Sequence, residues 1–334
     1  MSELALIGLG SNLGDRRAIL DSAVASLSKT PGMLLRRVSS YHETVPVGGP
    51  SGQGNYLNAA VLADVESDAF TLLGQLQSIE ETAGRARKER WGERTLDLDL
   101  LIFGARFLST PKLNVPHPKM SVRRFVLGPA SEIAPELVHL PTRMSIRSLF
   151  NHLDRKPHYV ALAGPPNTLK SEVFQRLLRE LPSRTVAERP GPAVPDHNFE
   201  APRQGQSPET MSESPVEKRL RQLGHAPKAE FLARLAALSL YRWTPEVMRS
   251  QWLVTEDCPL IEFESLQVCY SRPDQELVLN AITPTFAVVV DPDETLRRGP
   301  SLIARFPVIW PESKEDALAI SNEILAICSS ISPA

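Results

Sequence analysis

The sequence lacks most features of a disulfide-bonded, membrane-spanning or nucleic-acid-binding protein. Its only cysteines are Cys258, Cys269 and Cys328, an odd and widely spaced set that predicts buried thiols rather than a disulfide framework or a metal cluster. Its apolar runs are too short to span a bilayer, and its first residues lack the pattern of a secretory signal. Its formal net charge of −2 offers no global attraction to nucleic acid or an anionic membrane. We therefore expect a cytoplasmic protein with no nucleic-acid or membrane partner.

Proline, by contrast, is abundant. Many of the 29 prolines fall between residues 182 and 227, in a stretch that is also rich in glycine, serine, glutamine and glutamate. Such a composition buries too little apolar area to offset the entropy of ordering the chain, so we interpret 184–215 as a flexible insertion. The length of 334 residues suits two domains. We assign them to residues 1–154 and to residues 155–183 together with 216–334.

The first domain combines strands and helices without strict alternation. Amphipathic periodicity predicts helices at 16–27 and 69–82, and apolar or alternating runs predict strands at 4–9, 34–41, 56–63 and 96–103. This pattern is typical of an α+β sandwich.

The second domain shows strands that alternate with helices. Strands are predicted at 158–164, 252–255 and 285–291, and helices at 170–181, 216–223, 228–240 and from 313 to about 331. This alternation favours an α/β domain with a parallel sheet.

The richest chemistry lies between Gly84 and Leu100. Side chains alternate along a strand, so Asp97 and Asp99 are expected to share one face, with leucines on the other. Two neighbouring carboxylates repel unless a cation lies between them, and Mg²⁺ commonly binds one or two carboxylates together with substrate phosphates. The loop before them carries a cluster of arginines that can neutralise a triphosphate. The stretch therefore predicts a site for Mg²⁺ and a nucleotide, although an Asp-x-Asp pair alone is more often a solvated strand face.

These residues belong to a longer series of motifs that resembles the 6-hydroxymethyl-7,8-dihydropterin pyrophosphokinase family over about 145 residues. RWGERTLDLD is the most specific of them. In chain order they are GLGSNLG at 8–14, SSYHETVPVG at 39–48, YLNAA at 56–60, QSIE at 77–80, GRAR at 84–87, RWGERTLDLD at 90–99, PHPKM at 116–120 and RRF at 123–125.

The resemblance implies a ferredoxin-like α+β fold and transfer of the β,γ-diphosphate of ATP to the hydroxymethyl group of the pterin, giving AMP. It implies two Mg²⁺ ions held by Asp97 and Asp99, which with Arg85 and Arg94 form the implied catalytic group. The implied pterin contacts are Thr44, Pro46, Tyr56, Asn58, Trp91 and Phe125. The implied ATP contacts are Gln77, Glu80, Arg87, Lys112, His117 and Arg123. ATP and hydroxymethyl-dihydropterin are thus the expected small-molecule partners.

Without the resemblance, several of these residues have plainer explanations. Tyr56 and Phe125 would be core aromatics, Asn58 a buried structural amide, and His117 a turn residue between prolines. A non-catalytic nucleotide-binding or scaffold protein is the alternative from a different functional class.

The second domain resembles a degenerate P-loop kinase, of the deoxynucleoside or thymidylate kinase kind. The segment ALAGPPNTLKS at 161–171 follows a predicted strand and opens a predicted helix, as a phosphate-binding loop does. Gly164, Lys170 and Ser171 match the pattern, but Leu169 replaces the second glycine, whose backbone N–H groups would wrap the phosphates. A degenerate domain used for association and a second kinase activity both remain open.

Overall fold

The computed structural model describes residues 2–47, 52–84, 94–155, 158–163, 168–181, 252–255, 286–290, 306–313 and 315–331. They divide into two compact units, one formed mainly by Met1–Arg155 and the other within Lys156–Ala304 and Trp310–Ser321. The first unit also includes the described parts of Arg305–Ile309 and Asn322–Ala334, which the sequence interpretation grouped with the second domain.

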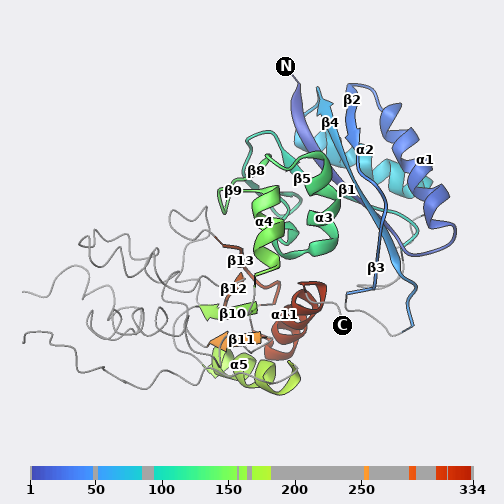
Figure 1. Cartoon of the computed structure of the whole chain (residues 1–334). Coiled ribbons are helices and arrows are strands. Elements are labelled where there is room, and N and C mark those ends of the chain that lie inside the picture. The colour runs from blue at the N-terminus through green and yellow to red at the C-terminus, as the bar shows by residue number, and fades with distance from the viewer. Residues whose placement is uncertain are drawn as a thin grey trace, which may run out of the picture. The chain divides into compact units, whose positions relative to one another are not determined.

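An antiparallel sheet forms the centre of the first unit (Figure 1). The strand order is β2-β4-β1-β5, and the short strand β3 also pairs with β4. The α+β class predicted for this region is therefore confirmed. The elements that build the sheet and cover one face are β1 (Glu3–Ser11), α1 (Arg16–Ser28), β2 (Met33–Val38), β3 (His42–Thr44), β4 (Tyr56–Val65), α2 (Ala69–Thr82) and β5 (Asp97–Phe103).

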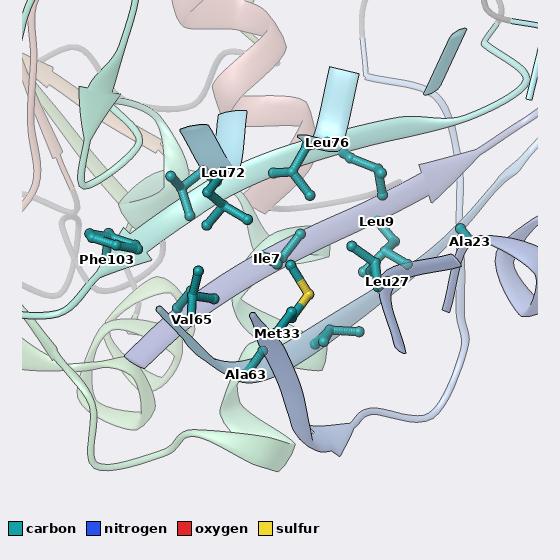
Figure 2. Close-up of a cluster of buried hydrophobic side chains, with 14 of the residues drawn as sticks. Ile7, Leu9, Ala23, Leu27, Met33, Ala63, Val65, Leu72, Leu76 and Phe103 are labelled. Carbon is teal, nitrogen blue, oxygen red and sulfur yellow. The ribbon is translucent and has the colours of Figure 1, made fainter. Parts of the chain in front are cut away.

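One face of this sheet is closed by helices α1 and α2. Alternate residues of β1 and β4 point to this face, and they meet leucines of both helices in one buried cluster (Figure 2). The cluster includes Ala5, Ile7, Leu9, Leu20, Leu27, Val61, Ala63, Leu72 and Leu76. Burial of these aliphatic side chains provides the main hydrophobic stabilisation of the unit.

Aspartates start both of these helices. The Asp15 carboxylate accepts a hydrogen bond from the N–H of Ala18 at 3.0 Å, and Asp68 accepts from Phe70 and Thr71 at 2.8 and 3.0 Å. Each side chain satisfies backbone donors that the first helical turn leaves without a partner. The caps fix where α1 and α2 begin, and thus which residues face the sheet.

Smaller elements complete the first unit. The segment after β5 forms β6 (Leu108–Ser109), β7 (Asn114–Val115), the 3₁₀ turn η1 (Met120–Val122), α3 (Arg124–Ile133), β8 (Val138–His139), β9 (Met144–Ser145) and α4 (Ile146–Leu153). Strand β13 (Val308–Ile309) and the second part of helix α11 (Ala317–Ile331) also fall in this unit.

The second unit contains a parallel strand arrangement. Strand β10 (His158–Ala163) pairs in parallel with β11 (Trp252–Thr255) and with β12 (Phe286–Val289), and helix α5 (Thr168–Glu180) follows β10. All four residues of β12 are buried, as expected for a strand covered on both sides.

The predicted element types agree with the described ones, with differences at the boundaries. The helix predicted at 69–82 is confirmed by α2, but β2 ends at Val38, short of the predicted residue 41. There the Ser39 N–H still donates to the Ala60 carbonyl at 2.9 Å, but the N–H of Ala60 donates to the Ser39 hydroxyl at 2.9 Å instead of to a backbone carbonyl. Helix α11 begins at Ala317 rather than 313, because Asp316 caps the N–H groups of Leu318 and Ala319. The insertion 184–215 and the predicted helices at 216–223 and 228–240 lie outside the described residues.

Candidate active site

A cavity of about 170 Å³ lies in the first unit, over the sheet face that α1 and α2 leave uncovered. Gly8 and Gly10 of β1 form its floor. A Cβ atom on Gly10 would lie 3.2 Å from Oδ1 of Asn58, and one on Gly8 would lie 3.3 Å from Cδ1 of Leu101. Any larger residue at these positions would therefore crowd the side chains that border the floor.

Strand β5 places two carboxylates beside these glycines. Asp97 pairs with Gly10 and Asp99 with Gly8 in the β1–β5 register, and both aspartates line the cavity. Leu98 and Leu100, which alternate with them, are 5% and 4% exposed. The predicted alternation thus brings both carboxylates to one place.

The two aspartates offer a metal ion an incomplete set of ligands. Among the described residues there is no group of three or more His, Cys, Asp or Glu side chains that could hold a metal ion. Mg²⁺ prefers oxygen ligands and commonly completes its octahedron with water and substrate phosphates. The chemistry of Asp97 and Asp99 therefore fits Mg²⁺ that is bound together with a phosphate, rather than a closed structural metal site.

Arg94 brings positive charge next to this pair. Its guanidinium forms an ion pair with Asp97. Two hydrogen bonds with Asn12 fix the backbone of Arg94. The N–H of Arg94 donates to Oδ1 of Asn12 at 2.8 Å, and the backbone N–H of Asn12 donates to the Arg94 carbonyl at 3.1 Å. The Asn12 amide also donates to Oε1 of Gln53, another residue that lines the cavity, at 3.2 Å. Asn12 thus holds Arg94 at the end of β1.

Another part of the cavity carries amide, hydroxyl and aromatic groups. The Nδ2 of Asn58 donates to Oγ1 of Thr44 at 2.8 Å, which fixes the orientation of the amide. Tyr56 and Phe125 also line the cavity. Aromatic faces together with an oriented amide suit a flat heteroaromatic ligand with polar edges.

His117 lies beside β5 and is neutral near pH 7. Its N–H donates to the Leu101 carbonyl at 2.8 Å, and its Nδ1 accepts the N–H of Lys119 at 3.2 Å. Burial lowers the pKa of His117 to about 3, and the positive charges of Arg123 and Lys119 add to the effect. Because Nδ1 is an acceptor, the ring proton resides on Nε2, which can donate to an anionic ligand without carrying a charge.

Eight of the residues proposed from the sequence line this cavity. They are Thr44, Tyr56, Asn58, Arg94, Asp97, Asp99, Arg123 and Phe125. Arg85, Arg87 and Trp91 lie outside the described residues, as does Gly164. Lys170 and Ser171 are in α5 of the second unit, where Lys170 is 1% exposed.

The other described residues among those proposed lie outside the cavity lining: Pro46, Gln77, Glu80, Lys112 and His117. Pro46 is half-buried between Val45 and Val47, which do line the cavity. Gln77 and Lys112 are exposed. Glu80 is 3% exposed, and its Oε1 accepts the N–H of Leu98 at 2.7 Å, so this carboxylate braces β5 from the closed side of the sheet. Contacts of these residues with ATP or the pterin stay predictions.

Sequence reasoning missed several residues that shape the cavity. Gly8, Gly10 and Asn12 stand in the first motif, but their roles depend on which strands flank β1. Lys119 and Glu323 are separated by about two hundred residues, and no local pattern indicates that they meet. Only Gly8 and Gly10 could have been found from the sequence, because two glycines on the same face of a strand indicate a place where a ligand or another chain segment comes close.

Comparison with known proteins identifies the family. A family model described as 7,8-dihydro-6-hydroxymethylpterin-pyrophosphokinase (HPPK) matches residues 6–135. A curated protein of Bacillus subtilis named 2-amino-4-hydroxy-6-hydroxymethyldihydropteridine pyrophosphokinase is 44% identical over 137 residues, which cover 41% of this chain and 81% of the relative. The chain belongs to the HPPK family. An HPPK of Pseudomonas aeruginosa is 37% identical over 162 residues, 47% of this chain and 99% of the relative.

Solved structures give a weaker comparison. A Plasmodium falciparum HPPK-DHPS crystal structure is 13% identical, with a TM-score of 0.36, and the match covers 54% of this chain and 55% of that one. That score is too low for an argument from structural likeness. Within the described part of the chain, no helix is both long and apolar enough to cross a membrane.

Proposed function

We propose that the chain transfers the β,γ-diphosphate of ATP to the hydroxymethyl group of 6-hydroxymethyl-7,8-dihydropterin, in folate biosynthesis. Membership in the HPPK family supports this activity. The observation that carries it is the joint presence of Asp97, Asp99, Arg94 and Arg123 around one cavity with Asn58 and Phe125. A scaffold protein would have no need to hold these groups together.

In this reaction the pterin hydroxymethyl oxygen attacks the β-phosphorus, the bond between that phosphorus and the AMP oxygen breaks, and the hydroxyl proton leaves to solvent. Asp97 and Asp99 would hold Mg²⁺, expected as two ions, which would offset the charge of the triphosphate when bound. Arg94 and Arg123 would supply further positive charge, and the Nε2–H of His117 is proposed as a hydrogen-bond donor to the phosphates.

The pterin end of the cavity depends on stacking and on one oriented amide. Tyr56 and Phe125 would stack against the pterin ring. Asn58, oriented by its hydrogen bond to Thr44, would form hydrogen bonds with the amide-like edge of that ring. Such positioning brings the hydroxymethyl oxygen to the β-phosphorus and contributes to the rate by fixing the reacting geometry. Arg85, Arg87 and Trp91 are proposed to act from the loop before Arg94, and Pro46, Gln77, Glu80 and Lys112 stay proposed contacts.

The identity of the nucleotide product tests this proposal. The full chain, incubated with Mg²⁺, the pterin and ATP, is expected to release AMP, and release of ADP alone would contradict the activity. Asp97→Asn should lower the rate by about a thousandfold or more, because it removes a metal ligand of charge −1. Asp64→Asn is the matched control, since Asp64 is also an aspartate on a strand of this sheet but pairs with Arg36 outside the cavity. Equal losses in both variants would show that Asp97 has no special role.

We further propose a ferredoxin-like arrangement for the first domain, a degenerate P-loop-kinase-like fold for the second, and a cytoplasmic location. The P-loop-kinase-like fold is supported by strand β10, which lies between two parallel strands and is followed by helix α5. The domain boundaries at 1–154, 155–183 with 216–334, and the insertion 184–215 belong to the same proposal.

A further inference from the structure

Helix α11 contributes one side of the cavity in the first unit. Glu323, Ala326, Ile327 and Ser330 all line it together with the HPPK residues, and all four fall within Asn322–Ala334 of that unit. Their spacing of three, four and seven residues places them on one face of the helix. The apolar members and the buried Ile324 and Ile331 explain why this part of the helix packs there.

Two polar contacts fix this helix to the segment before Arg123. The Nζ of Lys119 lies 3.1 Å from Oε1 of Glu323, and the two side chains are only 11% and 7% exposed. The Ser330 hydroxyl donates to the Val122 carbonyl at 3.2 Å. Residues 119–122 lead directly into Arg123 and Phe125, so the helix contacts the segment that carries a proposed ATP contact and a proposed pterin contact.

This side of the cavity lies outside the family domain. The family model ends at residue 135, and a match of 162 residues already covers 99% of the Pseudomonas aeruginosa relative. A match of that length that includes residues 6–135 cannot extend to α11 at 317. Glu323 therefore reaches the cavity from a part of the chain that these matches do not cover.

The added carboxylate changes the charge of the cavity. Among the described residues, the cationic side chains that line it are Arg94, Lys119 and Arg123, and the acidic ones are Asp97, Asp99 and Glu323. Asp97 and Asp99 are matched by Arg94 and by the expected Mg²⁺, whereas Glu323 is matched by Lys119. Glu323 thus cancels one of the positive charges that would otherwise attract a polyanionic substrate.

We propose that Glu323 sets the affinity of the HPPK site for ATP from outside the family domain, by pairing with Lys119 and placing a negative charge in the cavity. The inference rests on the proposed function for its choice of ATP as ligand. The carboxylate weakens triphosphate binding, and any displacement of α11 that separates Glu323 from Lys119 strengthens it. The pterin is uncharged, so its binding is much less sensitive to this pair.

Binding and kinetics of Glu323→Gln in the full chain test this inference. The amide keeps the side-chain volume but removes the charge. We expect the Kd of an unreactive ATP analogue with Mg²⁺, and the KM for ATP, to fall about three- to tenfold, with the KM for the pterin nearly unchanged. The effect should shrink at high salt. Lys119→Met should weaken analogue binding, because it leaves the carboxylate and removes the cation.

Glu136→Gln is the control for loss of a negative charge, since its side chain is 85% exposed and does not line the cavity. A purely packing role of Glu323 predicts that Glu323→Gln binds the ATP analogue equally well or more weakly, and that result would overturn the inference. Circular dichroism and thermal unfolding show whether each variant folds. Absence of AMP formation by the wild type would contradict the proposed activity, while the analogue titration would still decide the role of Glu323.

Discussion

The two faces of the β2-β4-β1-β5 sheet differ in what the alternate residues of one strand carry. On β1, Ala5, Ile7 and Leu9 belong to the aliphatic cluster under α1 and α2, whereas Gly8 and Gly10 leave the other face open as a cavity floor. The same strand therefore stabilises the unit on one side and makes room for ligands on the other. Stability and the proposed function are thus carried by opposite faces of the sheet, and substitutions can test that separation.

The largest stability effect is expected on the closed face. Leu72 of α2 is 0% exposed and lies in the cluster shown in Figure 2. Leu72→Ala should lower the free energy of unfolding by about 2–5 kcal/mol, through lost burial and the cavity it leaves. Urea unfolding followed by circular dichroism measures the loss. The specific activity of the folded fraction should stay near wild type, and a selective loss of activity would break the division between faces.

On the open face we expect a smaller effect, on substrate binding rather than on stability. Gly10→Ala places a methyl group about 3.2 Å from Oδ1 of Asn58, so the amide must move. We expect the KM for the pterin to rise about tenfold, a shift of about 1.4 kcal/mol, with little change in stability. Steady-state kinetics with each substrate varied in turn separates this effect from one on ATP. An unchanged KM for the pterin would mean that Asn58 does not contact it.

A third effect, of similar size, concerns the pH dependence of stability. The pKa of His117 is lowered in the folded state to about 3, mainly by burial, whereas the unfolded chain takes up the proton at its ordinary pKa of about 6.5. As pH falls below about 6.5, the unfolded state gains the proton first and the fold is destabilised, whereas above that pH the stability does not depend on this group. The loss from pH 7.5 to pH 5 should be about 1–2 kcal/mol for this residue.

His117→Asn should remove that part of the pH dependence, and urea unfolding at both pH values measures it. His139, buried with its pKa lowered to about 4, is a second source of acid sensitivity that remains in the variant. An identical loss in wild type and variant would show that His117 is not held neutral as described.

Much of the fold of the first unit could be predicted from the sequence, because its signals are local. Helix α2 begins after a capping aspartate and carries leucines at helical spacing, and β5 alternates aspartate with leucine. The same alternation placed Asp97 and Asp99 on one face. These predictions needed only the periodicity of a helix or a strand.

The rest could not be predicted, because it depends on neighbours that are distant in the sequence. The role of Gly10 follows from its position between Asn58 of β4 and Asp97 of β5, which only the strand order reveals. Glu80 belongs to a motif that predicts a ligand contact, but its carboxylate accepts a hydrogen bond from the backbone N–H of Leu98. The meeting of Lys119 with Glu323 needs a helix outside the family domain. Motif matching identifies residues, and tertiary packing decides which of them reach the cavity.

Asp97 and Asp99 are proposed to form a metal-binding centre on the open face of the sheet. Crystals of the full chain grown with Mn²⁺, an unreactive ATP analogue and the pterin would test this proposal through the anomalous signal of the metal. We expect anomalous peaks close to the carboxylates of Asp97 and Asp99 and to the phosphates of the analogue. Analogue bound with its metal elsewhere, or with no peak near these carboxylates, would contradict it.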